Sequence, residues 1–264
     1  MNIAVLSDIH LGRGDDADRR RGQDQELLRL LDYLEMNYDR IILLGDIWEL
    51  LTPKCPGMPE RELKIVRSAH PKLAQRFTQA PYQYIAGNHD YVVEKVEGVP
   101  KEVSVKIDQL SLLFTHGHQF DIWSKQLRYV GELVVWTSGW AARFGTQAFT
   151  RFFDRLHNLL TGTSVNEQLS SMELKLIDQS IKRNHQVTVI GHTHLPGIKE
   201  HEGHLLVNSG HCLGKILHFV SINTRQSFIT VYRVQQSQTE VMSEDNFDII
   251  DQVALPQAMN RAGL

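Results

Sequence analysis

Short apolar runs alternate with segments of helical periodicity over the first third of the chain. The runs at 3–6, 41–44 and 82–86 are rich in branched or aromatic residues and end at turn or charged residues, which favours buried strands over helices. Leucines and other apolar residues at helical spacing predict a helix over 24–37 and another over 60–78. This alternation predicts an α/β fold, with helices outside a mixed sheet.

The later part of the chain is predicted to be mostly β. Further strands are expected at 103–107, 110–115, 187–190, 205–208, 215–221 and 227–234. Together with the first three strands, they suggest two sheets packed face to face and flanked by helices. From Gln235 onward the sequence is polar and weakly patterned, so the segment 235–264 is predicted to be a peripheral tail.

Residues 119–183 do not fit this minimal plan, because a crossover to the strand at 187–190 needs far fewer residues. We interpret them as a helical insertion in a core of 1–118 and 184–234. Aromatic and aliphatic stripes with interleaved arginines run through it, and Ser164 with Glu167 predicts a capped helix start.

The insertion has two interpretations. It is either a helical hairpin that buries its own apolar face, or a lid over a functional site. A lid that is both apolar and arginine-rich suits an amphipathic phosphorylated substrate or a membrane surface. The residues assigned to such a substrate lid are Trp136, Arg143 and Arg151.

Composition narrows the class of protein. The chain has 264 residues, of which 42% are hydrophobic and 22% charged, as in an ordinary globular protein. Its net charge of -3 argues against a dedicated nucleic-acid binder. Cys55 and Cys212 lack metal-site spacing and are expected to be free thiols in a reducing compartment. With no signal peptide or membrane-spanning run recognised, an intracellular enzyme is expected.

Clusters of potential metal ligands follow most of the predicted strands, where loops from different strands converge. The clusters are Asp8-Ile9-His10, Gly45-Asp46, Gly87-Asn88-His89-Asp90, His116-Gly117-His118 and Gly191-His192-Thr193-His194. Their candidate ligands are two carboxylates, one amide and four imidazoles: Asp8, His10, Asp46, Asn88, His116, His192 and His194. This all-nitrogen-and-oxygen set suits two octahedral ions that share a carboxylate, which favours Mn²⁺ or Fe and leaves Zn²⁺ open.

Each cluster taken alone is weak evidence, since an aspartate at a strand end is usually a cap or turn residue. His118 is as readily an exposed turn residue as a neighbour of the metals. The histidines outside the clusters are interpreted as structural or surface residues, with His211 a remote candidate for the site. The conjunction of all the clusters, each after a predicted strand, is what makes the site specific.

The order D-x-H, G-D, G-N-H-D, H and G-H-x-H resembles the calcineurin-like metallophosphoesterase family. The resemblance implies a four-layer α-β-β-α sandwich of two mixed sheets with a dinuclear metal centre. One ion would be held by Asp8, His10, Asp46 and His194, and the other by Asp46, Asn88, His116 and His192. Asp46 would bridge them. His89 would act on the phosphate as general acid or charge stabiliser, oriented by Asp90, and a hydroxide between the ions would attack phosphorus.

A narrower resemblance concerns the run Gly45-Asp46-Ile47-Trp48-Glu49, the insertion and a helix over 164–181. These features look like the UDP-2,3-diacylglucosamine pyrophosphatase group of lipid A biosynthesis, which carries arginine where this chain has His89. The resemblance implies a cytoplasmic enzyme, with the insertion a peripheral contact to the inner membrane. The alternatives are a phosphodiesterase or phosphatase with another small or nucleotide substrate, and a non-catalytic metal-binding scaffold. Because the ligand set is intact, the enzyme is favoured over the scaffold.

Overall fold

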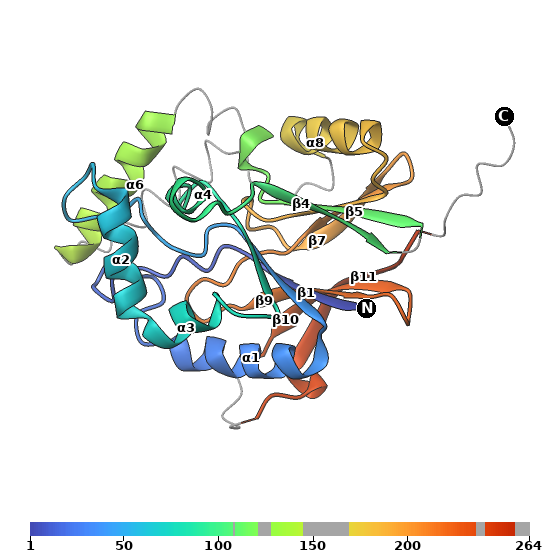
Figure 1. The fold of residues 1–264 in the computed structure, drawn as a ribbon, viewed down its shortest axis with the longest axis horizontal. Helices are drawn as coiled ribbons and strands as arrows, with labels where there is room; N and C mark the ends of the chain where they lie inside the picture. The colour runs from blue at the N-terminus through green and yellow to red at the C-terminus, as the bar shows by residue number, and fades with distance from the viewer. Residues whose placement is uncertain (108, 121–127, 145–168, 236–240, 257–264) are drawn as a thin grey trace, which may run out of the picture.

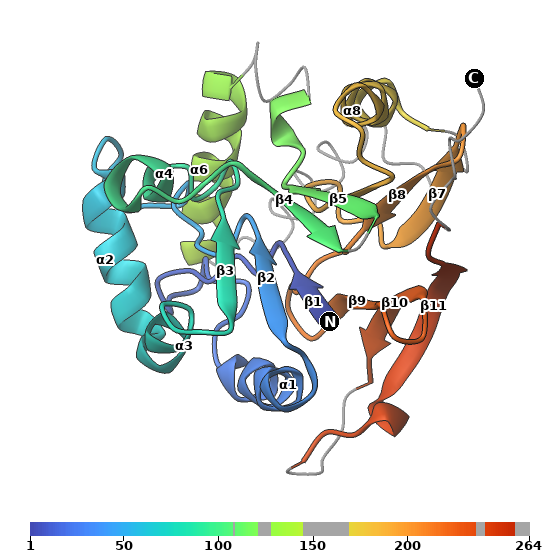
Figure 2. The same cartoon turned by 45° about the vertical axis from the view of Figure 1, so that its right-hand side comes forward.

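The computed structural model describes residues 1–107, 109–120, 128–144, 169–235 and 241–256, and Figures 1 and 2 show its fold from two sides. Two mixed sheets dominate it. The six-stranded sheet has the order β11-β10-β9-β1-β2-β3 and the five-stranded sheet the order β4-β5-β6-β8-β7. This architecture confirms the predicted fold class.

In the first sheet β1, β2 and β3 are parallel, whereas β9, β10 and β11 continue it in antiparallel pairing. Its strands are β1 (Asn2–Leu6), β2 (Arg40–Leu44), β3 (Tyr82–Ile85), β9 (His218–Asn223), β10 (Phe228–Val234) and β11 (Phe247–Ala254). In the second sheet β5, β6 and β8 are parallel and the outer strands antiparallel. Its strands are β4 (Glu102–Ile107), β5 (Leu110–Thr115), β6 (Val187–Ile190), β7 (Gly197–His201) and β8 (His204–Asn208).

Helices cover the outer faces of both sheets (Figure 1). The described helices are α1 (Asp24–Asn37), α2 (Pro59–Ala69), α3 (Pro71–Arg76), α4 (Val92–Glu97), α6 (Arg128–Arg143) and α8 (Ser171–Lys182), with short 3-10 turns η1 (His118–Phe120) and η2 (Glu244–Asn246). Leucines of α1 and α2 pack with Ala4 and Leu6 on one side of β1. On the second sheet, Leu176 and Ile177 of α8 pack against Ile190 and Leu206.

Alternation along β1 divides the core. Ile3 and Val5 point between the sheets, where they belong to one cluster with Phe114 and Val189, whereas Ala4 and Leu6 point to the helices. Each large apolar side chain buried in this way contributes about 1.5–3 kcal/mol relative to an exposed one. Strands buried on both faces carry nearly continuous apolar runs, which is why the run at 3–6 lacks polar alternation.

Some sequence-based element boundaries were wrong. The helix expected over 60–78 is two helices, because Pro71 lacks an amide donor and the chain breaks at His70. The helix α8 begins with a capping box of Ser170 and Glu173, while the capped start predicted from Ser164 and Glu167 lies outside the described residues and stays a prediction. The strand expected over 215–221 runs from His218 to Asn223.

The segment after Gln235 is not merely a peripheral tail. Its residues 247–254 form β11, which pairs with β10 along that strand's whole length and forms the edge of the first sheet. The alternating exposure of β11 fits an edge strand with one face on the protein. Among the described residues, no helix is long and apolar enough to cross a membrane, and both Cys55 and Cys212 are free thiols.

Candidate metal centre

The loops that follow β1 and β2 run side by side and bring the first two motifs together. The amide of Asp8 donates to the Gly45 carbonyl at 3.1 Å, and the amide of His10 donates to the Asp46 carbonyl at 2.9 Å. Past these pairs, Leu11 forms a parallel bridge with Trp48. The pairing of the two strands thus continues beyond the sheet and fixes Asp8 and His10 beside Asp46.

Most of the predicted ligands lie in left-handed backbone conformations. The φ angles are +52° at Asp8, +50° at His10, +54° at Asp46, +66° at His192 and +60° at His194. Such conformations cost roughly 1–3 kcal/mol each for residues with a side chain and are retained mainly at functional sites. These turns direct the side chains of Asp8 and His10 to one potential ligand group, and those of His192 and His194 to different groups.

Two glycines make room for the carboxylates. A Cβ on Gly191 would lie 2.5 Å from the Ser7 hydroxyl and 2.6 Å from Oδ2 of Asp8, and a Cβ on Gly87 would collide with the carboxylate of Asp46. The close approach of backbone to side chain at these points requires glycine. This is the physical reason why the G-N-H-D and G-H-T-H motifs begin with that residue.

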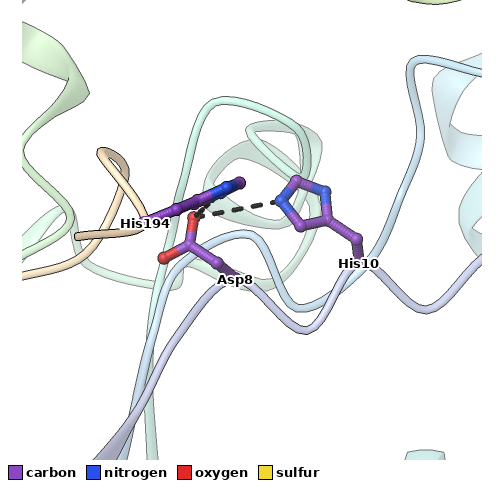
Figure 3. Close-up of side chains that lie close together, drawn as sticks. All are labelled: Asp8, His10 and His194. Atoms are coloured by element: carbon purple, nitrogen blue, oxygen red, sulfur yellow. Dashed lines mark hydrogen bonds and ion pairs between the residues drawn. The ribbon is translucent and has the colours of Figure 1, made fainter. Parts of the chain in front are cut away.

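Asp8, His10 and His194 form the first potential ligand group (Figure 3). Nε2 of His194 lies 3.1 Å from Oδ1 of Asp8, and Nε2 of His10 lies 3.9 Å from the same oxygen. The other oxygen of Asp8 accepts bonds from the Ser7 hydroxyl and from the amide of His192. One carboxylate oxygen of Asp8 is therefore held by the protein while the other faces the imidazoles.

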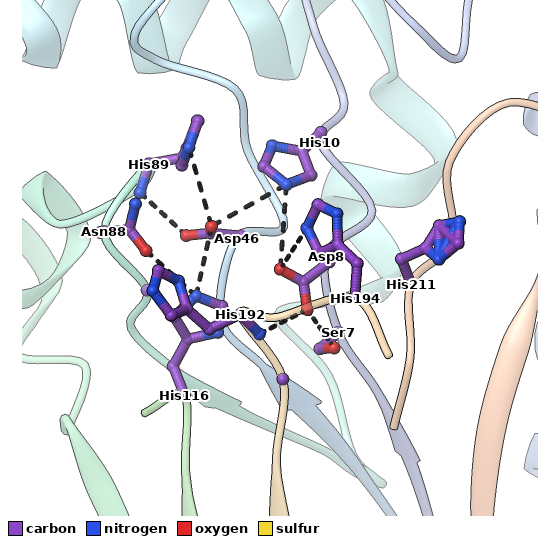
Figure 4. A network of polar contacts seen from close by, with 12 residues as sticks. Ser7, Asp8, His10, Asp46, Asn88, His89, His116, His192, His194 and His211 are labelled. Carbon is purple, nitrogen blue, oxygen red and sulfur yellow. Dashed lines mark hydrogen bonds and ion pairs between the residues drawn. The ribbon is translucent and has the colours of Figure 1, made fainter. Parts of the chain in front are cut away.

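Asp46, His116 and His192 form the second potential ligand group, and Asn88 lies beside it (Figure 4). Oδ2 of Asp46 is 3.2 Å from Nε2 of His116 and 3.8 Å from Nε2 of His10. Oδ1 of Asn88 is 3.2 Å from the same nitrogen of His116. Asp46 thus presents one oxygen to both groups, as a bridging ligand must, while its Oδ1 accepts the amide of His89 at 2.8 Å.

The ring orientations suit metal binding. Nδ1 of His116 is 2.8 Å from the Leu44 carbonyl, so this nitrogen carries the hydrogen and Nε2 is left as a ligand. Nε2 of His10 is buried and has no hydrogen-bond partner. An unpaired buried imidazole nitrogen between two carboxylates is costly unless a cation fills the space. The donors present therefore fit divalent metal ions.

The pKa shifts of the clustered side chains also favour binding of divalent metal ions. Burial raises the pKa of Asp8, but His194 and His116 outweigh that effect and hold its pKa well below the ordinary range. Burial likewise opposes ionisation of Asp46, yet His116 and His89 keep its pKa low. Although burial disfavours the imidazolium of His116, Asp46 and Asp8 raise its pKa to about 10. Without cations, the two carboxylates keep protons on neighbouring imidazoles, which is the balance that metal binding reverses.

His89 lies beside the second group with its Nε2 turned toward Asp46, at 4.0 Å from Oδ2. Burial lowers its pKa, but Glu49 and Asp46 outweigh this and raise it to about 9. The expectation that Asp90 orients this ring was wrong: Nδ1 of His89 bonds to Glu49 at 2.8 Å. Asp90 instead accepts bonds from the amides of Gly87, Ile47 and Trp48 and from Tyr84.

Asp90 is fully buried, and its bonds tie the loop after β2 to the loop after β3. A carboxylate satisfied by several backbone amides has little capacity left for a neighbouring imidazole. Asp90 therefore shapes the loops that carry Asp46 and Asn88, and it does not touch the reacting atoms. Its predicted catalytic assignment becomes a structural one.

Several residues near the centre were not predicted from the sequence as part of the site, or were only weak candidates for it. The ring of His211 stacks on His194 with centroids 5.4 Å apart, and His118 lies 5.4 Å from His116. Glu49 bonds to both His10 and His89. Ser7 bonds to Asp8. The only sequence signals for the last two were their places beside motif residues, within Gly45–Glu49 and immediately before Asp8.

Two of the residues assigned to the lid, Trp136 and Arg143, hydrogen-bond to the core instead of standing free. The indole nitrogen of Trp136 donates to the Pro53 carbonyl at 3.0 Å. Arg143 donates to Asp15 at 2.9 Å and to the Thr52 carbonyl at 2.6 Å. These bonds attach α6 to the loops that follow His10 and Glu49. Arg151 lies outside the described residues.

A family profile for the calcineurin-like phosphoesterase superfamily domain matches residues 1–227. The chain belongs to this superfamily. The match covers both sheets through β9 and every potential ligand. The superfamily assignment predicted from the motif order is therefore confirmed, and hydrolase and divalent metal-binding character come with it.

Among solved structures, this phosphoesterase domain is similar to Yfce, a phosphoesterase from E. coli, with 17% identity, coverage of 97% of this chain and 100% of that chain, and a TM-score of 0.46. It is also similar to Vacuolar Protein Sorting 29 from Cryptosporidium parvum, with 11% identity, coverage of 96% and 97%, and a TM-score of 0.47. A predicted phosphoesterase from Streptococcus pneumoniae has 17% identity, coverage of 94% and 96%, and a TM-score of 0.43. Comparison with curated proteins gives no match.

Proposed function

We propose that this protein hydrolyses a phosphodiester or pyrophosphate with two divalent metal ions, of which Mn²⁺ is the first candidate. The observation that carries the proposal is the carboxylate of Asp46, whose Oδ2 faces both His10 and His116. Two ligand groups that meet at one oxygen are what a dinuclear centre requires. The first ion would be held by Asp8, His10, Asp46 and His194, and the second by Asp46, Asn88, His116 and His192.

When bound, such ions supply a water nucleophile activated at neutral pH and Lewis acidity at the phosphoryl group. The protein holds the ligand side chains in fixed positions through backbone turns and hydrogen bonds, so little rearrangement is needed to receive the ions. His89 lies at the rim of this cluster with Nδ1 engaged by Glu49. Its remaining nitrogen can donate a proton to the leaving oxygen or to a nonbridging phosphoryl oxygen.

We further propose an amphipathic substrate, with UDP-2,3-diacylglucosamine of lipid A biosynthesis as the leading candidate, processed at the cytoplasmic face of the inner membrane. Two features support this. The run Gly45–Glu49 and a helical insertion resemble the corresponding pyrophosphatase group. In addition, α6 is anchored to loops that follow His10 and Glu49; Leu133 of this helix is 58% exposed, and Phe144 just after it is 75% exposed.

The decisive assay uses protein loaded with Mn²⁺, Fe²⁺ or Zn²⁺ against phosphomonoesters, phosphodiesters, nucleotide pyrophosphates and acylated nucleotide-sugars. Hydrolysis is expected to depend on added metal and to be fastest on the acylated pyrophosphate. The Asp46→Ala variant serves as the control for contaminating hydrolases. Absence of metal-dependent hydrolysis on every member of the panel would contradict the enzymatic proposal, whereas a preference for another phosphoester would contradict only the substrate.

A further inference from the structure

His211 is an imidazole beside the metal centre that the proposed hydrolysis does not use. It stands on the loop after β8, and its ring stacks on that of His194, with centroids 5.4 Å apart and ring planes 23° apart. Figure 4 shows it on the side of the cluster opposite His89. A row of rings connects the two sides, because the centroid of His10 lies 4.5 Å from that of His89 and 5.6 Å from that of His194. His211 thus closes the end of the row away from the proposed acid.

Hydrogen bonds to neighbouring segments fix the backbone of this loop. The amide of His211 donates to Nδ1 of His218 at 3.3 Å, and the amide of His218 donates to the His211 carbonyl at 3.1 Å. The amide of Cys212 donates to the Asp8 carbonyl at 3.0 Å. Arg20, which is fully buried, donates to the Cys212 carbonyl at 2.9 Å. The loop is therefore tied to the strand end that carries the first potential ligand group.

The side chain of His211 is positioned by ring packing. Besides stacking on His194, it meets His218 edge to face at a centroid distance of 4.9 Å. Its Nδ1 is buried and has no hydrogen-bond partner in the described part of the chain, although the residue as a whole is partly exposed. A buried ring nitrogen without a partner is uncommon and requires an explanation. Because no described group holds a hydrogen on Nδ1, the ring can carry one on Nε2 and donate it to a ligand.

We propose that Nε2 of His211 donates a hydrogen bond to the substituent that stays on phosphorus, and so favours diesters over monoesters. The inference deepens the proposed function and rests on it. The attacked phosphorus of a diester carries one substituent that leaves and one that stays, whereas a monoester carries only the leaving one. Since His89 is proposed to serve the leaving oxygen, an imidazole on the opposite side of the cluster is placed to contact the other substituent.

The competing interpretation is that the ring of His211 only supports His194 by stacking. Such support needs an aromatic ring but no nitrogen. His211→Phe keeps the ring and removes both nitrogens, whereas His211→Gln removes the ring and keeps an amide donor of similar reach. His201→Phe is the matched control, because His201 ends β7 in the hairpin that precedes β8, whereas His211 follows the opposite end of β8.

The first measurement compares two esters with the same leaving group on the full chain loaded with Mn²⁺. p-Nitrophenyl phosphate has no retained substituent, whereas the p-nitrophenyl ester of thymidine 5′-monophosphate retains a nucleoside. In His211→Phe, the ratio of kcat/KM on the diester to kcat/KM on the monoester should fall by about 3- to 10-fold, the size of one hydrogen bond. His211→Gln should keep more of this ratio than His211→Phe, and His201→Phe should match the wild type.

The second measurement does not depend on turnover. Zinc content and zinc affinity are determined for each variant, and the zinc-loaded proteins are then titrated with inorganic phosphate and with thymidine 5′-monophosphate. His211→Phe should bind zinc as the wild type does and should lose about 3- to 10-fold in affinity for the nucleotide relative to phosphate. Circular dichroism and thermal unfolding establish that each variant is folded.

The outcomes separate this role from the proposed function. Equal losses of kcat/KM on the two esters in His211→Phe, or no loss on either, would overturn the role of His211. Weaker zinc binding in His211→Gln, together with wild-type behaviour of His211→Phe, would show instead that the ring only supports His194. If the wild type hydrolyses neither ester, the proposed function fails, and an unchanged affinity of His211→Phe for thymidine 5′-monophosphate would then overturn the His211 contact as well.

Discussion

The two carboxylate oxygens of Asp46 have different partners. Oδ1 accepts the amide of His89 and fixes the loop after β3, while Oδ2 faces an imidazole of each ligand group. Removal of this side chain should therefore affect metal binding more severely than removal of any single histidine.

We expect Asp46→Ala to abolish hydrolysis and to reduce metal content sharply, because one carboxylate serves both ions. Metal content is measured by elemental analysis after equilibration with Mn²⁺ or Zn²⁺. Asp16→Ala provides a control, since that aspartate is exposed and pairs with Arg21. Two full metal equivalents in Asp46→Ala would contradict the bridging assignment.

Substitution of His89 should affect catalysis without affecting metal binding. His89→Ala is expected to keep both ions and to lower turnover by about 10²-fold, as for loss of a general acid. The loss should shrink for p-nitrophenyl esters, whose leaving group needs no proton. Metal content and turnover on good and poor leaving groups are measured on the same preparation, and His201→Ala on β7 is the control. Unchanged turnover on the poor leaving group would remove His89 from the mechanism.

Polar contacts and a close backbone approach attach the helix α6 to the core. Trp136 and Arg143 donate to backbone carbonyls of the loop after Glu49. A Cβ on Gly139 would lie 2.9 Å from Cβ of Thr52, so the helix packs closely against the same loop. A shift of α6 would therefore also displace the loop after Glu49.

For the double variant Trp136→Ala with Arg143→Ala, we expect activity on an acylated nucleotide-sugar to fall tenfold or more. Each lost hydrogen bond is worth about 0.5–1.5 kcal/mol, and more where a charge takes part. Activity on small chromogenic diesters should persist, because the metal loops hold each other through backbone bonds. Both activities and the melting temperature are measured on one preparation.

Phe144→Ser is the companion variant for this experiment, because it removes an exposed ring just after α6 that stacks on Trp140. It should lower activity on the acylated substrate without lowering the melting temperature. Equal losses on both substrates in the double variant, in step with its melting temperature, would instead mark α6 as a structural hairpin.

His70 ties together segments that are distant in the chain. Its Nδ1 lies 2.8 Å from a carboxylate oxygen of Asp24 at the start of α1, and its Nε2 lies 3.1 Å from Asp18. The residue itself stands at the break between α2 and α3. Burial lowers the pKa of His70, but hydrogen bonds to Asp18 and Asp24 outweigh this and raise it to about 9.

This raised pKa predicts how stability depends on pH. The imidazolium contribution is fully present below the unfolded-state pKa of about 6.5 and is lost as pH rises through the folded-state pKa of about 9. The loss should be on the order of 2–3 kcal/mol. Urea unfolding at pH 6 and pH 9.5 measures it. In His70→Gln, which cannot titrate, the free energy of unfolding should fall less over this range, and an equal fall would refute the assignment.

Local sequence determined the elements and the donor set. The strands at 110–115 and 187–190 and the helix at 24–37 lie where the apolar patterns predicted them, because their burial is one-sided or complete and leaves a regular signature. The ligand clusters were equally visible. Asp8, His10, Asp46, Asn88, His116, His192 and His194 stand on loops after strands, and the structure brings them together. Their roles as ligands stay a prediction.

Contacts between distant segments were decided only by the tertiary structure. Asp90 stands next to His89 in sequence, yet its carboxylate turns to backbone amides, and Glu49 from another loop bonds to the imidazole. The strand β11 was missed because its apolar pattern is weak. An edge strand forms mainly because the backbone of a neighbouring strand, here β10, is free to pair with it. Neighbouring residues on a sharp turn point in different directions, so adjacency in the chain says little about contact. Which side chain orients His89 depends on how the loops after β2 and β3 pack, and local sequence does not encode that packing.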